Sequence, residues 1–581
     1  MKRIQYFCIA LVLLSGVFTS CNDMLTEEPK SMLVPSFFKT RQGIEGAVIS
    51  VYSGLRGSFP SIGTNVGTDI CYTSDAVGGW EKAPDTYDAL LEPGQGSFGW
   101  SFTNINNCNG VLQYGADADM PEARKAVLFA ETKFLRAFFY FRLVQSFGDV
   151  PLDLGAGKLA FNNVPSTLSV RAPVAEVYDV IIKDLEDAIT DLPIRAAQTG
   201  RATKKVALHL LSKVYLTRAT SKAGQTGDYA KAFQYADELI QNQARYETAL
   251  MQDYGMIHSE ETDDDGKNPE CLLRIQYKYG TPFGGSHSTS WVVTAGYENC
   301  RVLVTVNGAV TQVPPVPRCV RYQRPWRMYV TTPYLIWEVF ANKTTDSRWD
   351  NSFRMMWECV VDDERLKSVG LNMGDPGILL YFEGDDISGY PEACVKYKVE
   401  DLFDRNGFYK HSGVNYMYPT LFKFDDTKRV TPDESCYRPV IAFRLAETYL
   451  IAAEALVMQG KKTEALSYVN TIRKRAAYRP DLSAEALALA EADMTITDPN
   501  VLDIDFLLDE HARELYGETP RWYELVRTGK LIERVQAHNP QGAPNIKPHH
   551  VLRPVPQSQI DLMTDEEQKR VYQNPGYPGY Q

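Results

Sequence analysis

Apolar residues recur three and four positions apart over several long segments of this chain. One such segment runs from Pro121 to Phe147, where the spacing is followed by Val127, Ala130, Phe134, Phe138 and Phe141. Further large apolar residues flank these positions, so we predict a helix almost surrounded by core. Pro173 stands where a second amphipathic helix is expected to begin, and Pro193 stands just beyond its expected end. The pattern indicates a mainly α-helical framework.

Two pairs of shorter helices are predicted to follow one plan. Their apolar faces cover residues 208–215, 229–240, 445–456 and 465–476. In each pair a glycine precedes an alanine by five positions, namely Gly227 with Ala232 and Gly460 with Ala465. This small-residue spacing is typical of tetratricopeptide-like helical hairpins, in which two helices approach closely.

The pattern changes between these pairs. From about residue 247 to 438, short β-prone pieces alternate with Gly, Pro and Asn turns, and a second loop-rich stretch spans about residues 58–99. We therefore expect a tetratricopeptide-like helical hairpin scaffold, with its repeats mainly in 121–245 and 440–530, carrying a long irregular insertion with short β pieces. Long loops on a rigid frame usually serve function, so the two loop-rich stretches are the expected ligand-binding regions.

The N-terminus has the pattern of a bacterial secretory signal. Lys2 and Arg3 precede an apolar stretch, and small residues precede Cys21, which forms a lipobox-like end. We expect residues 1–20 to be a signal peptide, residues 21–30 a tether lipidated at Cys21, and residues 31–581 a single domain. No later stretch approaches eighteen uncharged apolar residues, so no transmembrane helix is predicted.

Composition argues against two classes of function, nucleic-acid binding and zinc-ribbon metal binding. The 581 residues carry a formal net charge of −12 and are 11% aromatic. An acidic chain without a concentrated basic segment is a poor candidate for nucleic-acid binding. Among the cysteines after Cys21 no CxxC pair occurs, which disfavours a zinc ribbon and leaves any disulfide pairing open.

Several motifs occur in an order that resembles the SusD/RagB family of surface lipoproteins from Bacteroidota. They are AFRLAETYL at 442–450 with AAEA at 452–455, VNTIRKRA at 469–476, LLDEHAREL at 507–515, RWYELVRTG at 521–529, DSR at 346–348, LRPVP at 552–556 and QNPGY at 573–577. The resemblance implies a lipid-anchored helical scaffold at the outer membrane. It also implies that the protein captures glycan, or in some members peptide, above a partner SusC-like TonB-dependent transporter.

Five residues are candidates for ligand binding. Trp80 lies in a Gly-rich loop, in a region where the family tends to place ligand contacts, with Asp75 as its expected polar partner; Trp291, Tyr297 and Trp326 stand beside Gly, Ser or Pro in the insertion. Sugar rings present apolar C–H faces that stack on aromatic rings, while their hydroxyls need polar partners. These residue types in loops therefore favour an oligosaccharide ligand.

Enzymatic and metal-dependent functions have weaker support. No Gly-x-Ser-x-Gly elbow or paired-histidine metalloprotease helix occurs, so the chain is expected not to be an enzyme and to need no cofactor. The acidic turn at residues 259–268 resembles the start of an EF-hand loop, but Leu272 stands where a bidentate Glu is required, which leaves only incidental calcium open.

Three functions remain. A cell-surface glycan-binding lipoprotein that delivers oligosaccharides to its transporter is favoured, because the aromatic residues concentrate in loops. A peptide-binding import lipoprotein of the same fold is the first alternative. A protein-interaction scaffold built from helical repeats is the second, and it would place its exposed aromatic residues on the concave helical surface.

Overall fold

The computed structural model describes residues 34–88, 95–164, 166–167, 169–263, 266–410 and 415–579. The predicted signal peptide, Cys21 and the tether lie outside the described residues. The longer helices are α3 (Arg41–Gly54), α5 (Gln95–Tyr114), α6 (Glu122–Phe147), α7 (Val174–Asp191), α8 (Lys204–Thr220), α9 (Asp228–Gln241), α13 (Leu445–Met458), α14 (Lys462–Ala476), α15 (Ala484–Met494), α16 (Ile504–Leu515), α17 (Arg521–Arg527) and α18 (Leu531–His538). In the part of the chain so described, no helix combines the length and the apolar character needed to cross a membrane.

Shorter helices and strands connect this framework. The short helices are α2 (Pro35–Phe38), α4 (Ala83–Thr86), α10 (Thr289–Val293), α11 (Ser347–Asp350), α12 (Glu364–Lys367), α19 (Gln557–Asp561) and α20 (Glu566–Tyr572). The strands are β1 (Cys71–Thr73), β2 (Val150–Pro151), β3 (Arg171–Ala172), β4 (Cys271–Ile275), β5 (Val302–Val306), β6 (Ala309–Val313), β7 (Tyr329–Thr331), β8 (Phe353–Arg354), β9 (Met356–Glu358), β10 (Pro376–Tyr381), β11 (Val395–Lys398), β12 (Thr420–Leu421) and β13 (Val440–Arg444). They form small sheets of two or three strands.

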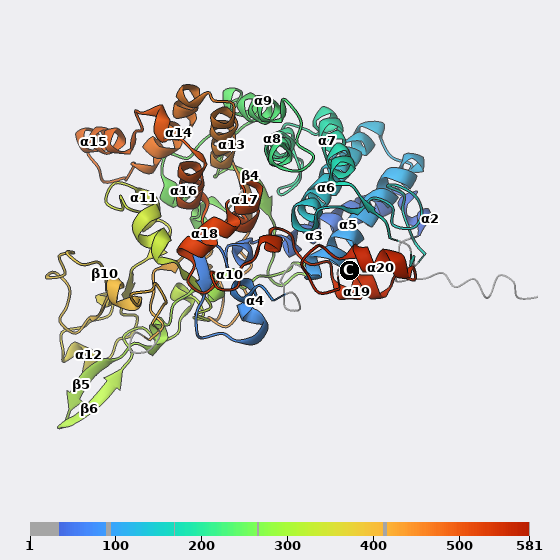
Figure 1. Ribbon diagram of the computed structural model, residues 1–581. Helices are drawn as coiled ribbons and strands as arrows, with labels where there is room; N and C mark the ends of the chain where they lie inside the picture. Colours follow the sequence, from blue (N-terminus) through green and yellow to red (C-terminus); the bar gives the residue numbers. More distant parts are fainter. Residues whose placement is uncertain are drawn as a thin grey trace, which may run out of the picture.

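The predicted helical scaffold is confirmed. α6 follows Pro121 and buries most of its residues, as the dense apolar pattern predicts, and α7 ends at Asp191, two residues before Pro193. Pro173 is the residue that precedes α7, one position before the first helical residue. Figure 1 shows α5 to α9 and α13 to α16 as layered helices, with the β5–β6 hairpin projecting far from them.

The two predicted helix pairs are α8 with α9 and α13 with α14, and α13 packs against α9 to join them. Ala232 and Ala465 are completely buried, so these small side chains lie where the helices approach. Gly227 and Gly460 have φ values of +96° and +77°, a left-handed conformation that glycine adopts without strain. The repeated Gly and Ala positions therefore reflect turn geometry and close helix packing.

A buried network of ion pairs accounts for the DSR motif. Arg348 lies 2.7 Å from Asp346 and 3.1 Å from Glu514, and Arg444 lies 2.8 Å from the other oxygen of Glu514. Burial alone would raise the pKa of Glu514, but the arginines around it bring the pKa down to about 2. The network joins α11, β13 and α16, so the motif serves the scaffold.

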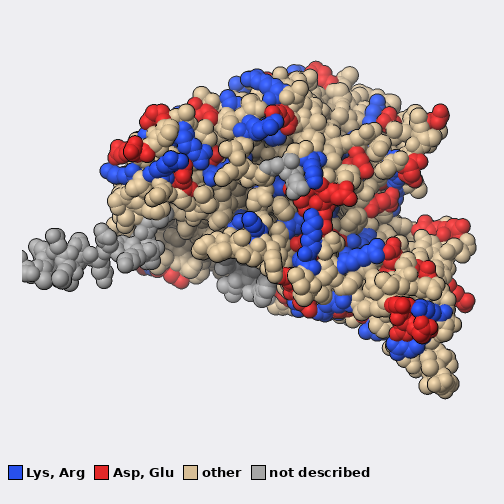
Figure 2. All heavy atoms as spheres, turned by 180° about the vertical axis from the view of Figure 1, so that it is seen from behind, with Lys and Arg blue, Asp and Glu red and all other residues tan. Residues whose placement is uncertain are grey.

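Charged side chains of both signs are mixed over the face shown in Figure 2. Lys and Arg stand beside Asp and Glu there, and no broad area of a single sign covers this face. This face therefore presents no broad single-sign surface to attract a charged partner over long range.

Candidate functional site

The pairing of β1 with β7 joins the two loop-rich regions. The strands are antiparallel, and beyond their ends the N–H of Ser74 donates to the carbonyl of Met328 at 2.7 Å. Asp75 follows Ser74 and is exposed. The early loop that begins at Asp75 therefore starts beside residues 324–328, although about 250 positions separate them in the chain.

Two tryptophans from the insertion lie against each other at this point. Trp291, in α10, and Trp326 have ring centroids 5.1 Å apart and planes at 67°. The backbone N–H of Trp326 donates to the carbonyl of Trp291 at 3.0 Å. The Arg324 guanidinium lies 5.2 Å from the centroid of Trp291 and 5.5 Å from that of Trp326. We refer to Trp291, Arg324 and Trp326 as the Trp326 platform.

The two rings differ in exposure. Trp326 keeps 37% of its surface exposed, whereas Trp291 keeps 6%. The expectation that the Trp291 ring contacts a ligand is therefore corrected: its ring is buried and holds the outer ring in place. An exposed indole beside a guanidinium can stack on an apolar ring face while donating hydrogen bonds to oxygen atoms around it.

Acidic side chains hold Arg324 over the two rings. Its Nε lies 3.3 Å from a carboxylate oxygen of Asp433, which also accepts from Arg318 at 2.9 Å. Arg318 is paired in turn with Glu298 at 2.7 Å. This chain of ion pairs restricts the Arg324 side chain, so the platform is organised before any ligand arrives.

A second cation–aromatic pair lies next along the chain. Arg327 stands 5.2 Å from the ring centroid of Tyr416, and its backbone N–H donates to the carbonyl of Thr294 at 3.1 Å. The Nε of Arg327 is buried and has no hydrogen-bond partner among the described residues. Such a donor is available to a ligand or to an ordered water.

The structure places the early-loop candidates only in part. Asp75 lies 3.7 Å from Lys82 in an exposed ion pair, so its carboxylate remains accessible. The backbone of Trp80 belongs to a helical turn at Gly79–Lys82, and its side chain lies outside what the structure describes. Ligand binding by Asp75 and Trp80 therefore stays a prediction.

Tyr297 does not present a ring to solvent. Its side chain is completely buried, its hydroxyl donates to the carbonyl of Gln323 at 2.6 Å, and it accepts from the N–H of Cys319 at 3.3 Å. Burial raises the pKa of the Tyr297 hydroxyl. The expectation that this ring stacks on a ligand is therefore corrected: Tyr297 is a core residue, because flanking glycines in the sequence do not reveal which loops fold inward.

Sequence reasoning missed three residues that the structure brings to the site: Arg324, Arg327 and Tyr416. Arg324 and Arg327 flank Trp326 in the stretch RPWR, and two arginines beside a tryptophan are a readable signal for a cation–aromatic cluster. No comparable signal marks Tyr416, because it reaches the site through a contact between distant parts of the chain.

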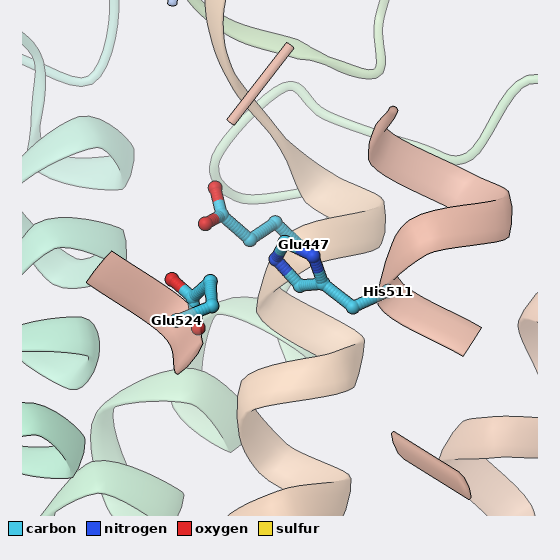
Figure 3. Close-up of side chains that lie close together, drawn as sticks. All are labelled: Glu447, His511 and Glu524. Atoms are coloured by element: carbon cyan, nitrogen blue, oxygen red, sulfur yellow. The ribbon is translucent and has the colours of Figure 1, made fainter. Parts of the chain in front are cut away.

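A second cluster of chemically capable side chains lies inside the helical scaffold. Glu447 of α13, His511 of α16 and Glu524 of α17 place one potential metal-binding atom each within 4.8 Å of one another (Figure 3). Lys213 of α8 lies 2.5 Å from Glu447 and 3.1 Å from Glu524. We refer to these four residues as the Lys213 cluster.

The Lys213 cluster does not fit a metal ion. Burial alone would lower the pKa of Lys213, but Glu447 and Glu524 outweigh it and raise the pKa, so the ammonium stays charged. Burial likewise opposes ionisation of Glu447, yet Lys213 and His209 bring its pKa down to about 2. The lysine thus supplies the positive charge that a metal would bring, and the cluster ties four helices together.

The acidic turn that resembles an EF-hand start is also occupied by protein contacts. The Asp263 carboxylate accepts from Arg438 at 2.8 Å, and Glu260 accepts from Thr427. Asp265 lies outside the described residues. The structure thus shows an ion-pair role for Asp263 and a hydrogen-bond role for Glu260.

Comparison with known proteins agrees with this architecture. Residues 341–577 match the SusD family, and residues 23–216 match the family described as starch-binding associating with outer membrane. The chain belongs to the SusD family. The two matches leave residues 217–340 between them, and this stretch contains the whole Trp326 platform. The part that carries the platform is therefore the part least described by the family patterns.

Individual relatives span nearly the whole chain. SusD-like protein P2 of Formosa agariphila is 26% identical over 544 residues, covering 91% of each chain. The starch-binding protein SusD of Bacteroides thetaiotaomicron is 24% identical over 621 residues, covering 99% of this chain and 98% of the relative. Surface glycan-binding protein A of the same species, solved in complex with laminarihexaose, has a TM-score of 0.59 at 19% identity, covering 90% and 97%. The last similarity establishes the shared fold.

Proposed function

We propose that this SusD-family protein is a cell-surface glycan-binding lipoprotein that captures oligosaccharides and delivers them to a partner TonB-dependent outer-membrane transporter. The observation that carries the proposal is the exposed ring of Trp326, backed by Trp291 and flanked by Arg324. A pyranose ring stacks its C–H face on such an indole, and its hydroxyls accept from the guanidinium. The relatives that bind starch and laminarihexaose support a carbohydrate ligand.

The scaffold explains why the site is loop-borne yet ordered. α10 presents Trp291, and the β1–β7 ladder fixes the start of the early loop beside Trp326. In the proposal Asp75 and Trp80 form a second wall, so that a sugar lies between the early loop and the Trp326 platform. In the proposal Arg327, which stands against Tyr416, contributes a further hydrogen-bond donor.

The proposal also includes the location. Acylation of Cys21 would anchor the protein to the outer membrane through the tether at residues 21–30, with the folded domain exposed at the cell surface. The family description refers to association with the outer membrane, which supports this placement. The transporter partner follows from the family resemblance.

Affinity gel electrophoresis tests the ligand class. The domain without its signal peptide and Cys21 is run in native gels containing amylopectin, laminarin, xylan, mannan or pectin, beside the Trp326→Ala variant. We expect retardation by at least one polysaccharide, with loss of that retardation in the variant. Absence of retardation in every gel, together with binding of a casein digest, would contradict glycan capture and favour the peptide-binding alternative.

A further inference from the structure

Two hollows adjoin beside the residues that follow β4. One, of about 490 Å³, is bounded by the segment 426–439, and the other, of about 590 Å³, is bounded by α3. Thr199 and Gln276 line both, so the hollows meet at these side chains. We refer to the pair as the β4 groove.

An aromatic ring stands at the α3 end of the β4 groove. Phe283 is 95% exposed and has a φ of +60°, which is strained for a bulky side chain. Its loop is closed by a hydrogen bond from the N–H of Lys278 to the carbonyl of Gly284 at 3.0 Å. A Cβ at Gly284 would lie 2.0 Å from the Lys278 carbonyl oxygen, so only glycine fits. The loop therefore holds a phenyl ring out in water.

Arg56 of η1 (Leu55–Gly57) holds this loop through hydrogen bonds to its backbone. Its Nε donates to the carbonyl of Gln276 at 2.8 Å, and its Nη1 donates to the carbonyl of Phe283 at 2.6 Å. The guanidinium also lies 5.4 Å from the ring centroid of Tyr277. These contacts fix the loop, so the exposed Phe283 ring is held beside the groove.

A second aromatic ring stands at the other end of the groove. Tyr279 is 58% exposed and packs edge-to-face on Tyr437, with centroids 4.9 Å apart. Between the two ends, the Nε2 of Gln276 is buried and has no hydrogen-bond partner in the part of the chain that the structure describes. The groove thus offers two exposed rings and an unused amide donor.

The charged groups of the groove are only partly paired within the protein. Asp263 lies 2.8 Å from Arg438, and Arg201 lies 2.6 Å from Glu131. The α3 side of the groove is lined by Arg56, Arg201 and Arg274 and by no described carboxylate, so basic groups outnumber acidic ones along the groove. Exposed rings, amides and guanidinium groups suit a ligand rich in hydroxyl groups.

We propose that the β4 groove binds further sugar units of an oligosaccharide whose other units lie on the Trp326 platform. The two surfaces meet across one short segment: Asp433 pairs with Arg324 of the platform, and the next residue, Glu434, lines the groove. The inference rests on the proposed function and adds to it a preference for long chains.

Calorimetric titration with oligosaccharides of two lengths tests the groove. The probes are laminaribiose with laminarihexaose and maltose with maltoheptaose, titrated into the wild type and the Tyr279→Ala/Phe283→Ala double variant. Two exposed stacking rings are each expected to contribute roughly 3- to 10-fold in affinity, so the double variant should bind the longer probe about 10-fold or more weakly. Affinity for the short probe should not change.

Matched variants separate the outcomes. Leu489→Ala removes another exposed apolar side chain, on α15, and should leave both affinities unchanged. Trp326→Ala should weaken both short and long probes. If the double variant binds the longer probe as tightly as the wild type, the proposed sugar binding in the β4 groove is wrong, and the proposed function is unaffected. A wild type that binds neither series nor any polysaccharide in the gels overturns the proposed function and the groove together.

Discussion

The indole of Trp326 packs edge-to-face on the indole of Trp291, with ring centroids 5.1 Å apart. One ring is exposed and the other is buried, so the pair divides two tasks that a single aromatic residue would have to combine. In the proposed site the outer ring contacts the ligand, and the inner ring fixes the orientation of the outer one. Mutations at the two positions should therefore have different consequences.

Trp326→Ala is expected to weaken glycan binding with little effect on folding. The lost contact is an exposed stacking surface, so we expect an affinity loss of roughly 5- to 20-fold. The melting temperature should stay close to that of the wild type, because a partly exposed ring contributes little to the core. Calorimetric titration and differential scanning calorimetry measure the two effects on the same sample.

Trp291→Ala is the matched control for this pair. Truncation of a buried tryptophan destabilises a protein by about 3 to 5 kcal/mol, so this variant should show a clear fall in melting temperature as well as weaker binding. Normal affinity in the Trp326→Ala variant would contradict the platform. Normal stability in the Trp291→Ala variant would contradict the supporting role of the inner ring.

Tyr297→Phe is predicted to affect stability alone. The change removes a buried hydroxyl that donates to the Gln323 carbonyl and accepts from the Cys319 N–H. Loss of such hydrogen bonds costs about 1 to 2 kcal/mol, measured as a shift in the urea midpoint. Because the ring does not reach solvent, glycan affinity should match that of the wild type. A fall in affinity without a change in stability would contradict the assignment of Tyr297 to the core and would indicate that it contacts the ligand.

The contrast between Trp326 and Tyr297 shows how far sequence reasoning reaches. Helices such as α6 could be predicted because their apolar spacing is a local property, and the motif order supported the family. Whether a loop aromatic residue faces solvent depends on contacts between distant segments, such as the β1–β7 pairing that places Met328 beside Ser74. Periodicity carries no information about such contacts, so Trp326 and Tyr297 looked alike in sequence.

Lys213→Ala is expected to destabilise the scaffold and to create a metal site. Removal of the ammonium leaves Glu447 and Glu524 buried without their shared counter-charge, and breaking a buried pair in this way costs about 3 to 5 kcal/mol. Carboxylates and an imidazole are zinc ligands, so zinc should restore part of the lost melting temperature. Differential scanning calorimetry with and without zinc measures both effects.

The wild type provides the control for this metal prediction. With Lys213 in place, neither zinc nor a chelator should move its melting temperature, because the ammonium already pairs with both carboxylates, Glu447 and Glu524. A stabilising effect of zinc on the wild type would contradict the structural role assigned to Lys213.

Stability should fall as the pH drops from about 6.5 to 4, and His511 is predicted to contribute to that fall. Burial lowers the pKa of His511 to about 4, with Lys213 and Arg521 acting in the same direction against the attraction of Glu524 and Glu447. The unfolded chain takes up a proton near the ordinary histidine pKa of about 6.5, whereas the folded protein does not until about pH 4. The unfolded state therefore binds more protons in this window, and its relative free energy falls as the pH decreases.

Urea unfolding at pH 7 and pH 5 checks this contribution through the variant His511→Gln. One histidine with such a shift makes the wild type lose about 2 kcal/mol between the two pH values, and the variant should lack that share of the loss. Burial also lowers the pKa values of three other histidines, His258, His287 and His550, to about 4, so the variant should keep the remaining acid sensitivity. Equal losses in the wild type and the variant would mean that His511 is protonated in the folded state at pH 5. In that case its charge would be stabilised by Glu447 and Glu524, and the Lys213 cluster would hold one more positive charge than the structure indicates.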